Sequence, residues 1–207
     1  MAEVRSILYV FLPCRPVYPV GLIYLADAVH KRYPEIRQRI LDLSLIPPRQ
    51  CEGTLLEQVR ELDPEIVGFS WRDIQVFAPH EGDPSLKYAF NFYYSPNPIK
   101  KLMASLKGLK YLWTYYRGIQ DSLSYPWLIR KRFPDKRIMI GGGAFSVFAD
   151  QLIHQLPEGT LGILGEAEDA LLKVIEGKNL EEERSIVRKG SQVFRGVKRS
   201  TTSIADL

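Results

Sequence analysis

The stretch YVFLPCRPVYPVGLIYLADAVHK (Tyr9–Lys31) carries two structural patterns in succession. It opens with a continuous apolar run, as in a strand that is buried on both faces of a sheet. From Gly21 onward, apolar residues recur at helical spacing, and a loop with three prolines separates the two patterns. A buried strand, a loop and a helix form the first unit of an open α/β sheet. Ligands of such sheets usually bind at this loop.

The same change of period repeats along the chain and predicts an alternation of strands and helices. The expected strands are Ile7–Leu12, Ile66–Ser70, Lys136–Gly143 and Gly159–Glu166, together with a second strand that contains Ile40–Leu43. The expected helices are Gly21–Arg32, Thr54–Leu62, Phe145–Leu156 and Glu168–Gly177. This alternation predicts an α/β fold, a flavodoxin-like (Rossmann-like) five-stranded parallel sheet with helices on both faces.

Two regions depart from this alternation. Residues 71–135, between the third and fourth strands, are far longer than one crossover helix needs, and we predict a helical insertion there. One or two helices are expected within Pro98–Phe133. After Gly177, the polar segment SIVRKGSQVFRGVKR predicts a C-terminal β-hairpin that turns at Lys189–Gly190. We therefore expect residues 1–177 to form the α/β domain and residues 178–207 a hairpin and linker.

The composition of the 207 residues is that of a soluble globular protein, and it restricts the partners. No apolar run reaches the roughly 18 residues of a membrane span, and no signal peptide is evident, so a cytoplasmic protein is expected. The net charge of +4 is mild and gives no reason to expect nucleic acid. Cys14 and Cys51, and the three histidines, lack metal-site spacing. The sequence therefore predicts no catalytic and no metal-ligating residue.

Common ligands of α/β sheets leave motifs that this chain lacks. A dinucleotide site needs G-x-G-x-x-G directly after the first strand, where this chain has PCRPVYPVG. The segment GGGAFS follows the fourth strand instead. A phospho-acceptor site needs acidic residues after the first strand for its metal ion, and a P-loop needs G-K-[ST]; both are missing. A different ligand must be considered.

Four segments, in order, carry a resemblance to a known domain. They are YPVGLIYLADAV (18–29), DPEIVGFSW (63–71), RIMIGGGAFSVFADQLI (137–153) and LGILGEAEDALLKVIEG (161–177). Together they resemble the N-terminal cobalamin (B12)-binding domain of cobalamin-dependent radical S-adenosylmethionine (SAM) enzymes. The segments IVRKGSQVFRG and SIADL resemble the hairpin and linker that lead to the catalytic domain of that family.

The resemblance implies that the chain binds cobalamin for a radical SAM methyltransferase or cyclase. The catalytic domain of that family binds a [4Fe-4S] cluster through C-x-x-x-C-x-x-C and uses S-adenosylmethionine. That motif is absent here, so we expect the chain alone to be non-catalytic and to work with a radical SAM domain in cis or in trans. It is interpreted either as an excised domain or as a stand-alone relative.

The proline-rich loop bears on how the cobalt would be held. Many cobalamin proteins carry D-x-H-x-x-G after the first strand, and the histidine ligates cobalt. When Gly21 is aligned with the glycine of that motif, Tyr18 takes the position of the histidine and Pro16 that of the aspartate. A phenol with a pKa near 10 is a poor cobalt ligand at neutral pH. The resemblance therefore implies base-off, His-off binding, with loop prolines such as Pro19 in a wall under the corrin and Val20 as a further cofactor contact.

Further residues are implied at the carboxyl ends of the later strands. A slot for the nucleotide tail is expected beside Ser70 and the glycines, and the corrin is expected near the start of the insertion. The tail-slot residues are Ser70, Gly142, Gly143, Gly165 and Glu166, Ala144 is a further expected cofactor contact, and the residues expected near the corrin are Trp71 and Arg72. Each also has a plainer interpretation. Gly141–Gly143 can be a tight turn, Tyr18 a core residue, and Ser70 or Glu166 a helix or strand terminus.

Several interpretations remain open for the insertion and for the function of the whole chain. Asn97–Arg137 is rich in Lys, Arg and aromatic residues. It is interpreted as helices that pack on the sheet with a solvated basic face, as a docking face for a catalytic domain or substrate, or as a contact with a membrane surface or nucleic acid. For the whole chain, the alternatives are a degenerate interaction module without cofactor and an enzyme that uses the cleft for a nucleotide-like ligand.

Overall fold

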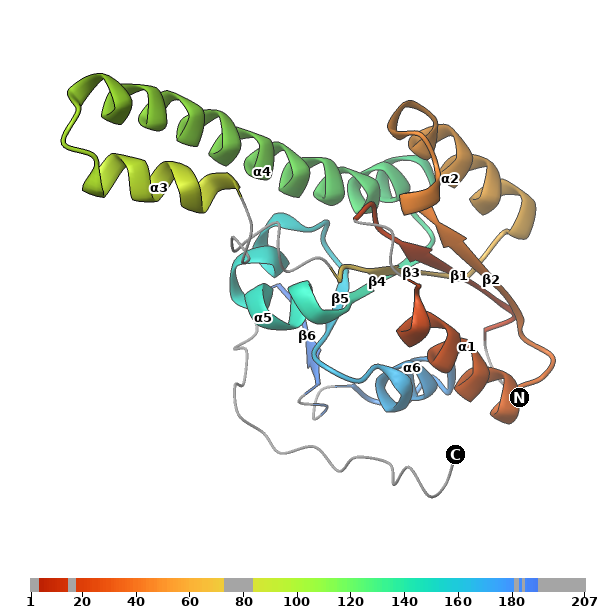
Figure 1. The fold of residues 1–207 in the computed structure, drawn as a ribbon. Coiled ribbons are helices and arrows are strands. Elements are labelled where there is room, and N and C mark those ends of the chain that lie inside the picture. Colours follow the sequence, from red (N-terminus) through yellow and green to blue (C-terminus); the bar gives the residue numbers. More distant parts are fainter. Residues whose placement is uncertain (1–3, 15–17, 73–83, 181–182, 184, 190–207) are drawn as a thin grey trace.

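The chain folds into a single sheet that is covered by helices on both faces (Figure 1). The structure, a computed structural model, describes residues 4–14, 18–72, 84–180, 183 and 185–189. Within them, no helix is long and apolar enough to cross a lipid bilayer. The strands are β1 (Ser6–Phe11), β2 (Arg37–Asp42), β3 (Ile66–Ser70), β4 (Arg137–Gly141), β5 (Leu161–Ile163) and β6 (Ile186–Val187).

The strand order is β2-β1-β3-β4-β5-β6. The first five of these strands are parallel, which confirms the predicted flavodoxin-like sheet. Strand β6 adds an antiparallel edge by pairing with β5, at Gly162 with Val187 and Ile163 with Ile186. It lies where the first strand of the predicted C-terminal hairpin was expected. The remainder of that hairpin, from Gly190 onward, lies outside the described residues.

Two apolar cores lie on opposite faces of the sheet. Alternate residues of the central strands point to opposite faces, so Tyr9 and Leu8 belong to different cores. Helices α1 and α6 cover one face, and α2, α5 and the last third of α4 cover the other. The bounds are α1 (Val20–Arg32), α2 (Pro48–Leu62), α3 (Pro84–Tyr94), α4 (Pro98–Arg132), α5 (Gly143–Leu152) and α6 (Glu168–Ile175), with short 3-10 turns at Leu43–Leu45 and Ile153–Gln155.

The predicted helical insertion is confirmed, and its shape is unexpected. Helix α3 runs back along α4, and this helical pair stands away from the sheet (Figure 1). Asn97 caps α4, since its Oδ1 accepts hydrogen bonds from the amides of Ile99 (2.9 Å) and Lys100 (3.3 Å). Only the last third of α4 enters the core, through Leu123 and Ile129 among others. The expectation that these helices pack on the sheet is therefore correct only for that part.

Candidate ligand-binding cavity

A cavity of about 240 Å³ lies between the sheet and the helix pair α1 and α6. Its walls come from the face of the sheet that carries Tyr9, and it extends to the carboxyl ends of the strands, where Gly165 and Glu166 are exposed. Its lining residues are Ile7, Tyr9, Gly21, Leu22, Leu25, Ile66, Gly68, Phe69, Ser70, Met139, Ile140, Gly141, Gly142, Ile163, Gly165, Glu166, Ala167, Glu168 and Leu171. The cavity thus reaches the edge at which parallel sheets bind their ligands.

Small residues in the two central strands form the floor of this cavity. In the strand register, Gly68 pairs with Tyr9 on one side and Met139 on the other. One step toward the carboxyl edge on the same face, Ser70 pairs with Gly141. A large side chain at any of these three positions would occupy the space between the sheet and helices α1 and α6. The absence of side chains at Gly68 and Gly141 therefore contributes to the hollow.

The hydroxyl group of Tyr9 takes part in a chain of hydrogen bonds behind the cavity. Its hydroxyl donates to Oε1 of Gln38 (2.8 Å), and Nε2 of Gln38 donates to the carbonyl of Ala26 (3.2 Å). A tyrosine phenol is neutral at physiological pH, and burial raises the pKa of Tyr9 further above its usual value. The aromatic ring of Tyr9 therefore offers an uncharged wall to a ligand.

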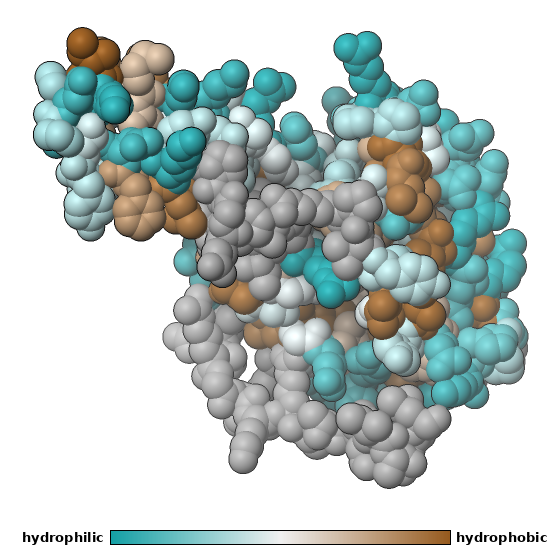
Figure 2. Space-filling model, viewed as in Figure 1, coloured by the Kyte–Doolittle hydropathy of each residue, from teal (hydrophilic) through white to brown (hydrophobic). Residues whose placement is uncertain are grey.

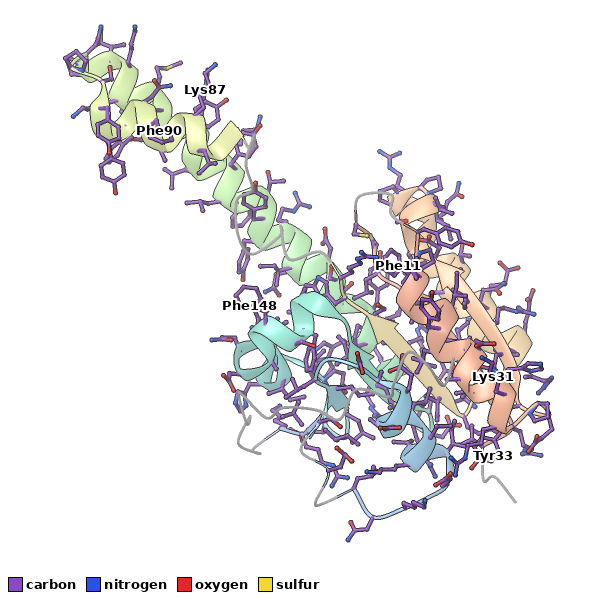
Figure 3. All side chains as sticks on the ribbon, turned by 60° about the horizontal axis from the view of Figure 1, so that its bottom comes forward. Phe11, Lys31, Tyr33, Lys87, Phe90 and Phe148 are labelled. Atoms are coloured by element: carbon purple, nitrogen blue, oxygen red, sulfur yellow. The ribbon has the colours of Figure 1, made fainter. Side chains whose placement is uncertain are left out.

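The far ends of α1 and α6 are tied together at the opposite edge of the sheet. Tyr33, which directly follows α1, donates from its hydroxyl to Oε1 of Glu176 at the end of α6 (2.7 Å). Arg32 pairs with the same carboxylate at 2.8 Å, and Tyr33 and Lys31 mark this end of α1 in Figure 3. Hydrogen bonds from Lys178 and Tyr33 lower the pKa of Glu176 to about 2. These contacts fix the spacing of the two helices that roof the cavity.

The rim of the cavity at β4 has a backbone that only glycine accommodates. Gly142 has a φ of 100°, and a Cβ atom there would lie 2.6 Å from the carbonyl oxygen of Trp71. The backbone at Trp71 crosses the end of β4 here, and two hydrogen bonds hold it in place. They run from the Trp71 amide to the Gly141 carbonyl (2.8 Å) and from the Ala144 amide to the Trp71 carbonyl (3.0 Å). The tight turn proposed for this segment is thus present, and the same turn lines the cavity.

The opposite rim is formed by the turn after β5. Gly165 has a φ of 66°, and its amide donates to the hydroxyl of Ser146 in α5 (2.8 Å). Helix α6 begins only at Glu168, so Glu166 belongs to the turn that precedes the helix. Ser146 was not among the predicted site residues. It positions this rim relative to α5 without lining the cavity itself.

The structure brings together part of the predicted site. Five predicted residues line the cavity: Gly21, Ser70, Gly142, Gly165 and Glu166. The Trp71 ring and Ala144 instead lie in the core on the other face of the sheet, so only their backbone reaches this edge. Gly143 is the exposed first residue of α5. Pro16 lies outside the described residues.

The loop before α1 lies beside the start of the insertion. Pro19 directly precedes α1, and Val20 is the half-exposed first residue of that helix. Tyr18 is 72% exposed, which excludes the interpretation of this side chain as a core residue. Nη1 of Arg72 lies 3.4 Å from the carbonyl oxygen of Tyr18, so the segments after β1 and β3 meet at the carboxyl edge.

Other lining residues were missed from the sequence. Gly68, Tyr9 and Met139 form the floor, and Leu22, Leu25 and Leu171 come from the covering helices. The sequence alone could have indicated Gly68, because a glycine inside a strand pattern often marks a close approach of another group. The others are ordinary core residues in the sequence, and only their arrangement in space reveals a gap between them.

The size and chemistry of the cavity restrict what it can hold. Whole small-molecule sites usually measure roughly 300–1,000 Å³, so a cavity of about 240 Å³ suits one part of a larger ligand. Its floor and roof are mostly apolar, with Ser70, Glu166 and Glu168 as polar groups. Within the described ranges, no three His, Cys, Asp or Glu side chains gather to hold a metal ion. A largely apolar group that enters from the carboxyl edge fits these features.

The comparisons with known proteins give structural matches. No family model matches the chain, and no curated protein matches its sequence. One similar structure is the radical S-adenosylmethionine methyltransferase TsrM from Kitasatospora setae with cobalamin and a [4Fe-4S] cluster bound (TM-score 0.58, 19% identity). Another is TsrM with its tryptophan substrate and the SAM analogue aza-SAM (TM-score 0.55, 19% identity).

The extent of the match limits what it establishes. Each alignment covers 89% of this chain, but the chain spans only 27% and 30% of the two TsrM chains. At this identity the likeness establishes the fold, a Rossmann-like α/β domain that also occurs in a radical SAM methyltransferase. Ligand and reaction must be argued from the cavity.

Proposed function

We propose that this chain binds cobalamin, with the corrin at the carboxyl edge of the sheet and the nucleotide tail in the cavity under α1 and α6. The observation that carries the proposal is the cavity floor at Gly68, Ser70 and Gly141, which leaves space for a flat group between sheet and helices. The fold is shared with TsrM, one of whose structures contains cobalamin. The four ordered segments that resemble B12-binding domains support the same ligand.

The residues of this chain have separate roles in the proposed complex. Gly68, Gly141 and Gly142 leave room for the base of the tail, and Ser70 offers it a hydrogen-bonding hydroxyl. Gly165 and Glu166 form the opposite rim, which Ser146 holds in place. Arg72 lies next to Tyr18 at the mouth, where its guanidinium is able to donate hydrogen bonds to amide carbonyls of the corrin.

We infer base-off, His-off binding. Among the described residues, the cavity lining contains no histidine, and His30 and His154 are exposed on helical segments. A tail placed in the cavity is held away from the cobalt. The cobalamin would carry a methyl group or an electron for a reaction in a radical SAM domain outside this chain, a methyltransferase or cyclase that uses a [4Fe-4S] cluster and S-adenosylmethionine.

The domain organisation follows from this proposal. Residues 1–177 would form the cobalamin-binding unit, and the last 30 residues would lead toward the catalytic domain. Strand β6 pairs antiparallel with β5, so the chain runs from Ser185, beside Leu164, to Lys189, which pairs with Glu158 ahead of β5. Lys189 thus lies toward the amino end of β5, and a following domain would reach the corrin only if the linker after it returns to the carboxyl edge.

Titration with hydroxocobalamin tests the proposal, with gel filtration and the absorbance of the protein peak as the readout. We expect co-elution near one to one. Gly68→Val should fold, because a Cβ atom at Gly68 makes only an ordinary contact of 3.8 Å with Tyr9. Its methyl groups should fill the cavity and weaken binding at least about tenfold. Gly53→Val, on the exposed side of α2 with nothing within 4 Å, is the matched control.

A second ligand separates the tail from the corrin. Cobinamide has the corrin ring without the nucleotide tail, so Gly68→Val should leave its affinity unchanged while that for cobalamin falls. If no cobalamin co-elutes with the wild-type chain, the proposed function is wrong, and the domain is an interaction module or binds another ligand. If Gly68→Val binds cobalamin as tightly as Gly53→Val, the tail does not occupy this cavity.

A further inference from the structure

The α3–α4 hairpin, residues 84–120, is an arm that extends away from the sheet (Figure 1). Its two helices pack on one another through Tyr88 and Tyr111, whose ring centroids lie 5.5 Å apart, and through Ala104, which is buried. Nζ of Lys107 lies 5.9 Å from the centre of the Tyr88 ring. The arm therefore has an inner face, on which the helices contact each other, and an outer face toward solvent.

Large apolar side chains cover the outer face. On α4 they alternate at spacings of three and four residues, so they form one stripe along the helix. The stripe consists of Ile99, Leu102, Leu106, Leu109, Trp113 and Tyr116, each more than half exposed. Ala104 and Tyr111 lie on the other side of the helix, toward α3. Within the described part of the chain, nothing covers the stripe.

The tip of the arm is apolar on both helices. The end of α3 contributes Phe90, Tyr93 and Tyr94, and the start of α4 contributes Ile99 and Leu102. These side chains are 62% to 77% exposed. Figure 2 shows hydrophobic residues at the end of the arm beside hydrophilic ones, and Figure 3 places Phe90 and Lys87 on α3. Exposed apolar surface of this kind marks an interaction site.

All charged side chains of the arm are basic. Residues 84–120 contain no Asp or Glu, and their basic residues are Lys87, Lys100, Lys101, Lys107, Lys110 and Arg117. These six exceed the net charge of +4 of the whole chain. The arm is thus the main source of the positive charge, which favours a negatively charged partner. The combination of exposed aromatic, aliphatic and basic side chains without acids is typical of segments that bind the interface of anionic membranes.

A second copy of the chain fits the arm poorly. The stripe has the heptad spacing of a coiled coil, but Lys110 and Arg117 flank it at equivalent positions without acidic residues to pair with. Two stripes in contact would therefore bring like charges together. A single acidic helix on the stripe would leave the aromatic residues at the end of α3 exposed, because α3 packs on the opposite side of α4. A lipid interface is able to accommodate the exposed apolar side chains of both helices at the tip together.

We propose that the α3–α4 hairpin binds anionic lipid bilayers by inserting its tip into the interface. The rings and aliphatic side chains at the tip enter the boundary between headgroups and acyl chains, and the ammonium groups of Lys100 and Lys101 reach the phosphates. This inference rests on residues outside the cavity and is independent of cobalamin binding. It assigns the domain to a membrane surface.

Flotation of the full chain with vesicles tests the proposal. We expect binding to vesicles of phosphatidylcholine mixed with phosphatidylglycerol, weak binding to pure phosphatidylcholine, and a loss of binding as salt is raised. One lysine near an anionic surface strengthens binding about fivefold. Replacing Lys100, Lys101, Lys107 and Lys110 together by Gln should therefore weaken it by at least about tenfold. Ile99→Ser with Leu102→Ser should weaken it as well.

A control with the same change of net charge excludes an unspecific effect. In it, Gln replaces the exposed Lys31, Lys131, Lys178 and Lys189, which lie outside the arm, and binding should persist. Circular dichroism and urea unfolding show that each variant is folded. The proposal is overturned if no vesicle is bound, if neutral vesicles are bound equally well, or if the control loses binding as much as the arm variant. A dimer in light scattering that Leu106→Asp dissociates, without lipid binding, would assign the stripe to a second copy instead.

Discussion

The carbonyl oxygen of Trp71 lies 2.6 Å from the position that a Cβ atom on Gly142 would take. The backbone of the segment after β3 crosses the end of β4 here, and its amide and carbonyl groups bond to Gly141 and Ala144. The crossing joins the start of the insertion to the rim of the cavity. Its geometry therefore affects both the stability of the fold and the shape of the candidate site.

Gly142→Ala should destabilise the fold. The φ of 100° is a conformation that side chains disfavour, and such strain costs about 1–3 kcal/mol, before the overlap with Trp71 is added. Urea unfolding measures the loss. Gly53→Ala in α2, where a Cβ atom meets nothing within 4 Å, is the control and should be neutral or stabilising by up to about 1 kcal/mol. A stable Gly142→Ala would show that the crossing relaxes easily.

Ser146→Ala should loosen the rim at Gly165. The Ser146 hydroxyl accepts the Gly165 amide at 2.8 Å, and Gly165 is exposed, so water is able to replace the lost partner. The free energy of unfolding should thus fall by no more than about 1 kcal/mol. Hydrogen exchange of the amides at 165–167 should nevertheless accelerate. Ser146→Thr keeps a hydroxyl and should restore slow exchange, and equal exchange in all three proteins would refute this role for Ser146.

Glu183 should make the attachment of β6 dependent on pH. Its carboxylate contacts Lys173 and accepts hydrogen bonds from the hydroxyl (2.6 Å) and the amide (3.2 Å) of Ser185. The hydrogen bond from Lys173, followed by that from Ser185, lowers its pKa from 4.5 to about 2. A carboxyl whose pKa is lower in the folded state stabilises the fold above its unfolded pKa, and loses this effect as the pH falls toward the folded value.

Glu183→Gln tests this linkage. The variant should be less stable than the wild type near neutral pH, and the difference should shrink between pH 4.5 and about 2. Urea unfolding over this range measures it. Glu158→Gln is a control, because Glu158 is 79% exposed and pairs with Lys189 only at the surface. A difference for Glu183→Gln that stays constant down to pH 2 would contradict the expectation.

The central part of the fold followed from sequence because its strands are continuous apolar runs. Ile66–Ser70 was predicted with the bounds that β3 has, and β1 is shifted by one residue. For the second strand only Ile40–Leu43 was recognised, whereas β2 begins at Arg37, because it is an edge strand whose polar residues pair with β1 on one side only. Its first residues carry no apolar pattern that would mark them as a strand.

The arm and the cavity were harder to predict, for different reasons. The aromatic run YAFNFYY has no clear helical period, and it forms most of α3 because Tyr88 packs on Tyr111 of α4. The rim glycines of the cavity were found through their motifs. The floor at Tyr9, Gly68 and Met139 comes from three strands that are distant in sequence, and it becomes visible only when their register is known.

Tyr18→Phe tests the lower face of the proposed cobalamin site. Because Tyr18 is largely exposed, the change should alter the free energy of unfolding by no more than about 0.5 kcal/mol. The electron paramagnetic resonance spectrum of bound cob(II)alamin should be the same in both proteins, without nitrogen superhyperfine splitting from an axial base. Strong nitrogen splitting would show that a histidine or the benzimidazole ligates the cobalt.

Two substitutions in the same helix test whether the arm contributes to the fold. Ile129, near the end of α4, is fully buried in the core, whereas Leu106 in the arm is 57% exposed. Ile129→Ala should cost about 2–5 kcal/mol, because it leaves a cavity among packed side chains. Leu106→Ala should change the free energy of unfolding by no more than about 0.5 kcal/mol. Alanine favours helices at least as well as either residue, so helix propensity cannot produce a large loss.

Urea unfolding of both variants, followed by the circular dichroism of the whole chain, gives this comparison. A small effect at Leu106 together with a large one at Ile129 means that the apolar stripe stabilises nothing within this chain, so that its exposed surface is available to a partner. A loss above about 2 kcal/mol at Leu106 would place that side chain in a packed core. The stripe would then be covered in solution by the chain itself or by a second copy, and the lipid-binding proposal would lose its basis.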